Sequence, residues 1–117
     1  MSRPLAFIVE DDPQLSRIFS LTLNEVYETE SITDGAQALE RLSKAAPQLV
    51  VLDINLPGVS GAEILHSIRA DSRLESTRVI LATADSRMAD ELREKADIVL
   101  LKPISIVQLR DLAQRLL

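Results

Sequence analysis

The sequence of 117 residues contains no cysteine, no tryptophan and only one tyrosine. A chain without cysteine has no disulfide, no thiolate zinc site and no cysteine nucleophile. The single histidine, His66, does not follow any of the apolar runs described below, so a zinc or copper site is not expected either. Because disulfides are characteristic of oxidising compartments, their absence favours the cytoplasm.

Basic residues are also few, since 13 Lys and Arg stand against 18 Asp and Glu, for a net charge of -5. Non-specific binding to nucleic acid or to an anionic membrane needs clustered Lys and Arg. We therefore expect a protein or a cation as partner, with no direct nucleic acid and no membrane. No apolar run approaches the ~20 residues of a membrane span. Acidic residues directly follow the first short apolar run, which is not the pattern of a signal peptide.

What the sequence does contain is four short and almost uninterrupted apolar runs, at residues 5–9, 49–54, 79–84 and 98–101. Such runs are typical of strands that are covered on both faces. A fifth segment, "YETESI" at residues 27–32, is polar and acidic, as expected for a strand at the edge of a sheet. These five segments are the predicted strands.

Apolar residues at helical spacing lie between and after the runs. The five predicted helices carry Leu15, Ile18, Phe19 and Leu23; Ala36, Leu39 and Leu42; Gly61, Ile64, Leu65 and Ile68; Met88, Leu92 and Ala96; and Ile106, Leu109, Leu112 and Leu116. Strict alternation of strand and helix predicts a parallel sheet with right-handed crossovers. With the polar strand at an edge, we predict one domain over residues 1–117, a doubly wound five-stranded α/β fold in the strand order 2-1-3-4-5.

Ligands of such folds bind at the carboxyl ends of the strands, near the point where the strand order reverses. The residues that end the apolar runs are Glu10 and Asp11, Asp53, Thr83 and Lys102. The first and third strands are neighbours in the predicted order, so Asp11 and Asp53 should face each other. Four strand ends are therefore expected to form one polar cluster.

Carboxylates that meet in a partly buried place repel one another, which raises their pKa values unless a cation offsets the charge. Mg²⁺ takes oxygen ligands, commonly one or two carboxylates, and fills its other positions with water and phosphate oxygens. Lys102 and Thr83 suit the oxygens of a phosphoryl group as a point charge and a hydroxyl donor. A carboxylate in this setting can form an aspartyl phosphate, and Asp53 is best placed for that role.

Each of these residues also has an ordinary structural interpretation. Asp53 precedes the turn sequence "NLPG", Thr83 is a β-branched strand residue, and Lys102 precedes Pro103 in a loop. Asp12, directly before Pro13, is interpreted as a helix cap rather than as a site residue. The coincidence of acidic, hydroxyl and basic residues at four strand ends favours a site.

The chain resembles, over nearly its whole length, the receiver domain of two-component response regulators. The resemblance is carried by "IVEDDP" at 8–13, "VVLDINLPGVSG" at 50–61, "VILATA" at 79–84 and "LLKP" at 100–103. It implies a flavodoxin-like fold and a phosphoacceptor domain rather than an enzyme, phosphorylated on Asp53 by a histidine kinase or phosphotransfer protein. It further implies that Mg²⁺ is held by Asp11, Asp53 and the backbone carbonyl of Asn55, with Glu10 acting largely through water. Thr83 and Lys102 would bind the phosphoryl oxygens, and the Lys102-Pro103 bond is a candidate cis peptide.

The sequence departs from the family at the position three residues before the Lys, where Val99 replaces the usual Tyr or Phe. The usual Phe after Lys-Pro is Ile104, and the stretch between Thr83 and Lys102 looks shorter than usual. The family's aromatic ring rotates when the Thr moves, so an atypical output mechanism is expected. The expected output surface combines the helix of residues 88–96, the strand 98–101 and the helix 106–116, which could also carry a homodimer.

Three alternatives stay open on the sequence. The first is a receiver-like interaction module that works independently of phosphorylation, which Val99 and the short fourth helical segment favour. The second is a phosphohydrolase with an aspartyl phosphate, although its typical D-x-D motif is missing from "EDDP". The third is a flavin-binding protein. It is disfavoured because aromatic residues are scarce and no phosphate-binding loop is evident in the sequence. The sequence does not name the kinase, the output partner or an output domain.

Overall fold

A parallel sheet of five strands, in the order β2-β1-β3-β4-β5, forms the middle of the molecule. The computed structural model describes residues 3–117, so residues 1 and 2 of the predicted domain lie outside the described residues. The strands are β1 (Leu5–Val9), β2 (Glu28–Ile32), β3 (Leu49–Asp53), β4 (Arg78–Thr83) and β5 (Ile98–Leu101). The strand order and the parallel pairing confirm the predicted fold.

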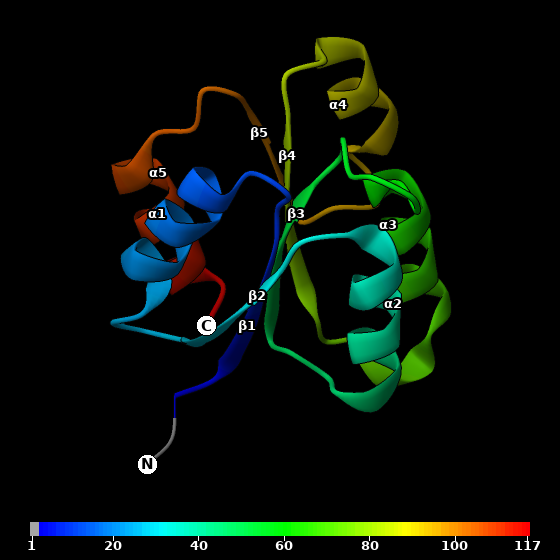
Figure 1. The fold of residues 1–117 in the computed structure, drawn as a ribbon, viewed down its shortest axis with the longest axis horizontal. Helices are drawn as coiled ribbons and strands as arrows, with labels where there is room; N and C mark the ends of the chain where they lie inside the picture. The colour runs from blue at the N-terminus through cyan, green and yellow to red at the C-terminus, as the bar shows by residue number, and fades with distance from the viewer. Residues whose placement is uncertain (1–2) are drawn as a thin grey trace.

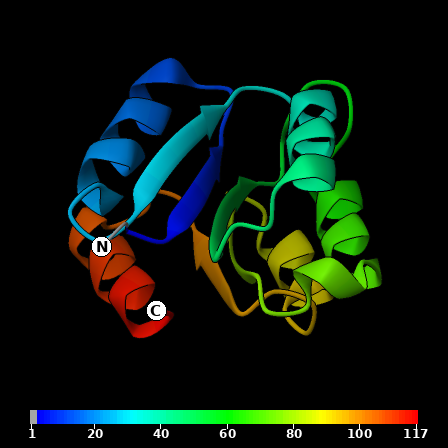
Figure 2. The same ribbon diagram turned by 90° about the horizontal axis from the view of Figure 1, so that it is seen from below.

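Helices cover both faces of the sheet (Figure 1). One layer holds α1 (Pro13–Leu23) and α5 (Ile106–Arg115), and the other holds α2 (Gly35–Lys44), α3 (Gly61–Ala70) and α4 (Ser86–Leu92). Figure 2 shows the two layers end-on, with the sheet between them. A short 3-10 helix at Ser72–Leu74 leads into β4 and was not predicted. In the described part of the chain, no helix is long and apolar enough to cross a membrane.

Side chains that alternate along the strands form two apolar clusters, one under each helix layer. Phe7, Val50 and Leu52 belong to the cluster under α2, α3 and α4. Their neighbours in the strands, such as Ile8 and Val51, belong to the cluster under α1 and α5. Because both faces are covered, the central strands carry the continuous apolar runs that predicted them.

Polar side chains cap the N-terminal ends of the helices. Asp12 caps α1 by accepting a hydrogen bond from the Gln14 backbone N–H at 2.9 Å, and Pro13 takes the first helical position, as predicted. Asp85 caps α4 in the same way. With seven residues, α4 is short, as the sequence indicated.

Two glycines let the loop after β3 pack closely against its surroundings. The N–H of Gly61 donates to the Ile54 carbonyl at 3.0 Å, and a Cβ added to Gly61 would lie 2.6 Å from the Ile54 Cα and collide with the Asp53 carbonyl oxygen. A Cβ on Gly35, at the start of α2, would collide with the Val59 carbonyl oxygen. The loop is thereby held over the carboxyl end of β3.

Candidate functional site

Three acidic residues meet at the carboxyl ends of β1 and β3. One carboxylate oxygen from each of Glu10, Asp11 and Asp53 lies within 4.8 Å of the others. They come together because β1 and β3 are paired in register, with Val9 opposite Leu52. The side chains differ in access, since Glu10 and Asp53 are only 2% and 3% exposed whereas Asp11 is exposed to solvent. The structure thus brings together the carboxylates that the sequence placed at these strand ends.

Lys102 joins this cluster from the end of β5. Its Nζ lies 3.3 Å from Asp53 Oδ1 and 3.4 Å from Glu10 Oε1. Its backbone N–H donates to the Thr83 carbonyl at 2.8 Å, and its peptide bond to Pro103 is cis, as expected. Burial alone would lower the pKa of Lys102, but the charges of Asp53 and Glu10 outweigh burial and raise it. The lysine is therefore held as a cation between two buried carboxylates.

Burial, together with the adjacent Asp53 carboxylate, raises the pKa of Glu10 to about 7. The backbone N–H of Asp12, which donates to Glu10 Oε2 at 3.2 Å, and the charge of Lys102 act in the opposite direction. The sequence predicted this crowding of negative charge. The charge of Lys102 does not fully offset the combined effect of burial and of Asp53 on the pKa of Glu10.

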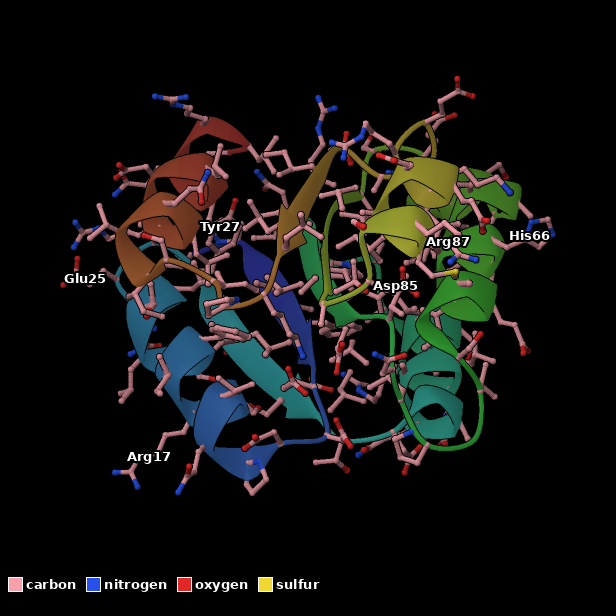
Figure 3. The ribbon with its side chains drawn as sticks, turned by 90° about the horizontal axis from the view of Figure 1, so that it is seen from above. Arg17, Glu25, Tyr27, His66, Asp85 and Arg87 are labelled. Atoms are coloured by element: carbon pink, nitrogen blue, oxygen red, sulfur yellow. The ribbon has the colours of Figure 1, made fainter. Side chains whose placement is uncertain are left out.

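Thr83 is the last residue of β4 and is fully buried. Its hydroxyl oxygen accepts a hydrogen bond from the Asp85 backbone N–H at 3.0 Å. Asn55 lies in the loop after β3, and its backbone N–H donates to Asp53 Oδ1 at 3.3 Å. All six predicted site residues therefore lie at the edge formed by the carboxyl ends of the strands. Figure 3 views the molecule from above this edge.

The donors at this edge fit a hard divalent cation. Carboxylate oxygens from Glu10, Asp11 and Asp53 converge, and oxygen is the ligand atom that Mg²⁺ prefers. The exposure of Asp11 leaves one side of the cluster open to water, which Mg²⁺ usually retains in its coordination shell. Burial and the neighbouring Asp53 raise the pKa of Glu10, so a bound cation would stabilise the charged form of this carboxylate. His66 lies on the outer side of α3, away from the cluster (Figure 3).

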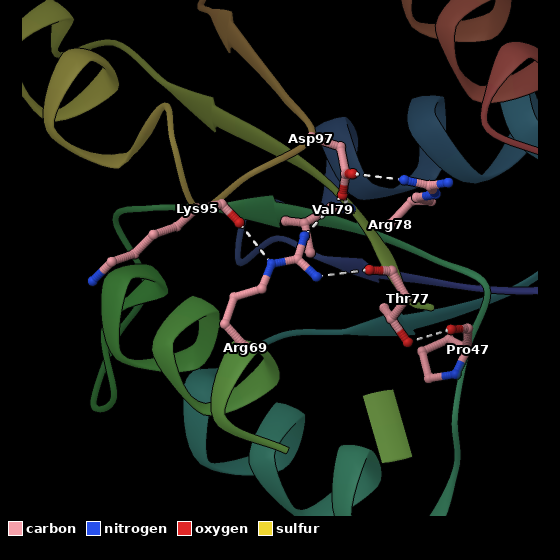
Figure 4. A network of polar contacts seen from close by, with 7 residues as sticks. All are labelled: Pro47, Arg69, Thr77, Arg78, Val79, Lys95 and Asp97. Atoms are coloured by element: carbon pink, nitrogen blue, oxygen red, sulfur yellow. Dashed lines mark hydrogen bonds and ion pairs between the residues drawn. The ribbon is translucent and has the colours of Figure 1, made fainter. Parts of the chain in front are cut away.

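Sequence reasoning did not foresee several contacts that shape this region. Asp85 caps α4 and bonds Thr83, and Arg69 connects α3 to the segments before β4 and β5 (Figure 4). Gly61 holds the loop that follows Asp53. An Asp two residues after the strand-ending Thr83 is a recognisable capping signal, but a lone Arg on a helix carries none.

Val99 lies in β5 opposite Leu81 of β4. Its side chain is half-buried and packs against the apolar cluster under α2, α3 and α4. It is therefore part of the packing beneath α4, with no ring to rotate.

Comparison with known proteins agrees with this geometry. The family model described as "Response regulator receiver domain" matches residues 6–114. The DNA-binding response regulator MtrA of Mycolicibacterium smegmatis is 34% identical over 105 residues, which cover 86% of this chain and 45% of MtrA. Hybrid signal transduction histidine kinase D of Dictyostelium discoideum is 29% identical over 83 residues, or 71% of this chain and 5% of the kinase.

Solved structures give the same result. The chemotaxis response regulator CheY4 of Vibrio cholerae superimposes with a TM-score of 0.89 at 27% sequence identity, over 99% of this chain and 100% of CheY4. The fold, the acidic edge and the family match define a two-component signalling domain. The chain belongs to the family of response regulator receiver domains. It spans less than half the length of the curated relatives named here.

Proposed function

We propose that this receiver domain accepts a phosphoryl group on Asp53 in a Mg²⁺-dependent reaction and thereby changes its interactions with an output partner. The observation that carries the proposal is the setting of Asp53. It is a buried carboxylate at a strand end, 3.3 Å from Lys102 and within a cluster that two more carboxylates complete. A structural turn residue needs none of these neighbours.

In the proposed reaction, an oxygen of Asp53 attacks the phosphorus of a phosphohistidine on the partner. The bond between phosphorus and the imidazole nitrogen breaks, its electron pair stays on that nitrogen, and an acyl phosphate forms. Lys102 pairs with one phosphoryl oxygen, and the Thr83 hydroxyl donates to another. Asp11, Asp53 and the Asn55 carbonyl would hold Mg²⁺, with Glu10 acting through water, and the ion would neutralise charge on the phosphoryl oxygens.

On this proposal the domain is a phosphoacceptor and not an enzyme acting on external substrates. It takes part in its own phosphorylation and in the slow hydrolysis of its own acyl phosphate. The histidine kinase or phosphotransfer protein is the donor, in the cytoplasm. An apolar groove of about 530 Å³, lined by Leu15, Ile18, Ile104 and Ile106, opens beside Lys102 and offers that donor a surface next to the acceptor.

The output side is proposed to be α4, β5 and α5. Leu101, Ile106 and Val107 are exposed apolar residues on β5 and α5, at 49%, 39% and 59% exposure. Such a surface suits a partner, an attached output domain or a second copy of the chain. MtrA is named as a DNA-binding protein. Here DNA binding would require a further domain, because this chain carries net negative charge.

A second candidate function is an interaction module that binds its partner whether or not Asp53 is phosphorylated. Val99 favours it, because this side chain offers no aromatic ring to couple the acceptor site to the output surface. The short α4 favours it too.

The experiment that tests the main proposal is incubation with Mg²⁺ and a small phosphodonor such as acetyl phosphate, followed by intact-mass measurement. One phosphoryl adduct is expected, and Asp53→Asn should abolish it. An adduct that survives Asp53→Asn would place the acceptor elsewhere. Partner binding that is the same with and without the adduct would support the interaction module instead.

A further inference from the structure

A cavity of about 540 Å³ lies at the end of the sheet opposite to the proposed acceptor site. Its volume is in the range of small-molecule sites in proteins. It is bordered by the starts of three strands, since Leu5 begins β1, Gln48 directly precedes β3 and Arg78 begins β4. Because β4 ends at Thr83, this strand has the cavity at its first residue and the acceptor site at its last. The cavity shares no residue with the apolar groove beside Lys102.

Hydrogen bonds between the strand starts hold the floor of this cavity. The Gln48 N–H donates to the Leu5 carbonyl at 2.9 Å, and the Arg78 N–H donates to the Gln48 carbonyl at 2.9 Å. The buried Thr77 hydroxyl donates to the Pro47 carbonyl at 2.7 Å (Figure 4). Small-molecule sites are usually largely formed before the ligand arrives, and these bonds meet that requirement.

The cavity lining supplies positive charge and hydrogen-bond donors. Arg73 and Arg78 line it, and in the described part of the chain no lining side chain is acidic. A guanidinium has five N–H donors. Within residues 3–117, Arg78 uses only Nη1, which donates to Asp97 at 3.2 Å, and Arg73 uses only Nη2, which donates to the Leu42 carbonyl and to Asp71. The other nitrogens of both side chains are therefore available to a ligand.

The charge around Arg78 is not balanced. Asp97 pairs with Arg78 at 3.2 Å and with Arg69 at 2.8 Å, and it also accepts a hydrogen bond from the Val79 N–H at 2.7 Å (Figure 4). One carboxylate thus faces two guanidinium groups, which leaves one positive charge in this group uncompensated. Arg78 is the more exposed of the two arginines and is the one that lines the cavity. An anion bound there would supply the missing charge.

The remaining walls of the cavity are largely apolar. Pro4, Ala46 and Leu116 bring carbon atoms to it from three segments that are far apart in the sequence. Apolar walls with a few placed polar groups are the usual composition of a small-molecule site. A ligand that matches this lining has an anionic head group and an apolar body.

We infer that this cavity binds a small organic anion, whose carboxylate, phosphate or sulfonate head pairs with Arg78 and Arg73 and whose apolar body packs between Pro4 and Leu116. The inference does not depend on the phosphorylation of Asp53. It gives the domain a second ligand site, at the amino ends of the strands whose carboxyl ends form the acidic edge.

The test uses 8-anilinonaphthalene-1-sulfonate as the probe, because it combines a sulfonate with apolar rings. Backbone amide chemical shifts are recorded as the probe is added to the whole chain. We expect saturable shifts at Gln48, Ser76 and Thr77, which border the cavity. The dissociation constant is read from these amides alone, so that binding at other places does not contribute. Absence of saturable shifts at these three residues would overturn the inference.

Arg78→Gln removes the uncompensated charge. Arg110→Gln is its control, because Arg110 is exposed on α5 and is not one of the residues that border the cavity. Binding of the probe should weaken roughly tenfold in Arg78→Gln, as expected for the loss of a charge-assisted hydrogen bond, and should be unchanged in Arg110→Gln. Equal affinity of these two variants would contradict the role of Arg78.

A second pair of variants leaves the contact between Arg78 and Asp97 in place. Ala46 is an exposed residue of the cavity wall, so Ala46→Glu adds a negative charge there and Ala46→Gln adds the same bulk without charge. The probe should bind several-fold more weakly to Ala46→Glu than to Ala46→Gln. Equal binding would show that the cavity does not select an anion and would overturn the inference. Circular dichroism checks that each variant is folded.

Discussion

At the scale of single residues, Lys102 is the cation that makes the acidic edge stable. It lies between Asp53 and Glu10, at 3.3 and 3.4 Å, and both carboxylates are buried. Lys102→Gln leaves them without a counter-charge, so we expect the free energy of unfolding near neutral pH to fall by roughly 1 to 3 kcal/mol. Urea denaturation without Mg²⁺ measures this loss. Lys95→Gln, at an exposed lysine, is the control. Equal stability of the two variants would contradict the assigned role.

The ionisation of Tyr27 can be followed by its own absorbance, because Tyr27 is the only tyrosine and the chain has no tryptophan. It is fully buried, and its hydroxyl donates to the Ala113 carbonyl at 2.7 Å. Burial raises the pKa of Tyr27 above its ordinary value of 10. Since the folded protein favours the neutral phenol, this contribution to stability is complete below pH ~10 and is lost as the pH rises through the raised pKa.

The prediction for Tyr27 is that tyrosinate absorbance rises only above pH 10, together with loss of the folded circular dichroism signal. Titration at the ordinary pKa with the fold intact would contradict it. Tyr27→Phe removes the hydrogen bond to Ala113 and should cost about 1 kcal/mol of the free energy of unfolding at neutral pH. Chemical denaturation measures that difference.

At the scale of elements, the acceptor loop depends on glycine for space. A Cβ on Gly61 would lie 2.6 Å from the Ile54 Cα, against the backbone that carries Asp53. We expect Gly61→Ala to cost more than about 2 kcal/mol of stability and to displace the loop after β3. Gly58→Ala is the matched control, because a Cβ added to Gly58 would meet no other atom. The only cost there is the positive φ of 75°, which alanine adopts with strain. That strain should cost roughly 1 to 2 kcal/mol. A Gly61→Ala protein as stable as Gly58→Ala would contradict the close approach.

Most elements were predictable because strands buried on both faces require continuous apolar runs. The ends of β1 and β5 match the predicted runs, at Leu5–Val9 and Ile98–Leu101. The predicted strand 27–32 begins one residue later, at Glu28, because the Tyr27 N–H donates back to Leu23 of α1 at 2.8 Å. That bond depends on how the helix ends, which a strand pattern does not encode.

The site residues were predictable for a related reason. In a parallel sheet the residue that ends a buried run is placed at a shared edge, so Glu10, Asp53 and Lys102 meet whatever lies between them. The contacts of Arg69 with Lys95 and Asp97 were not predictable, because they depend on how α3 lies against the turn before β5. An arginine on an amphipathic helix is usually solvated. The sequence pattern is the same whether the arginine is solvated or, like Arg69, bonded to a neighbouring turn.

At the scale of the whole molecule, metal binding should stabilise the folded chain, since the three carboxylates converge only when β1 and β3 are paired. Mg²⁺ at ten times its dissociation constant should add about 1.4 kcal/mol and raise the melting temperature. Asp11→Asn should lose this response. Asp12→Asn should keep it, because Asp12 caps α1 and Asn is an equally good cap. A similar loss in both variants, read by thermal melting with and without Mg²⁺, would contradict the assignment of Asp11 to the ion.

The central claim is that Asp53 carries the phosphoryl group, and the most direct test is to locate the acyl phosphate chemically. Borohydride reduces an aspartyl phosphate to homoserine, which peptide mass spectrometry identifies at a single position. After incubation with Mg²⁺ and acetyl phosphate, the account predicts homoserine at position 53 and none in a sample prepared without the phosphodonor. Homoserine at Asp11 or at another position, with aspartate retained at 53, would contradict it.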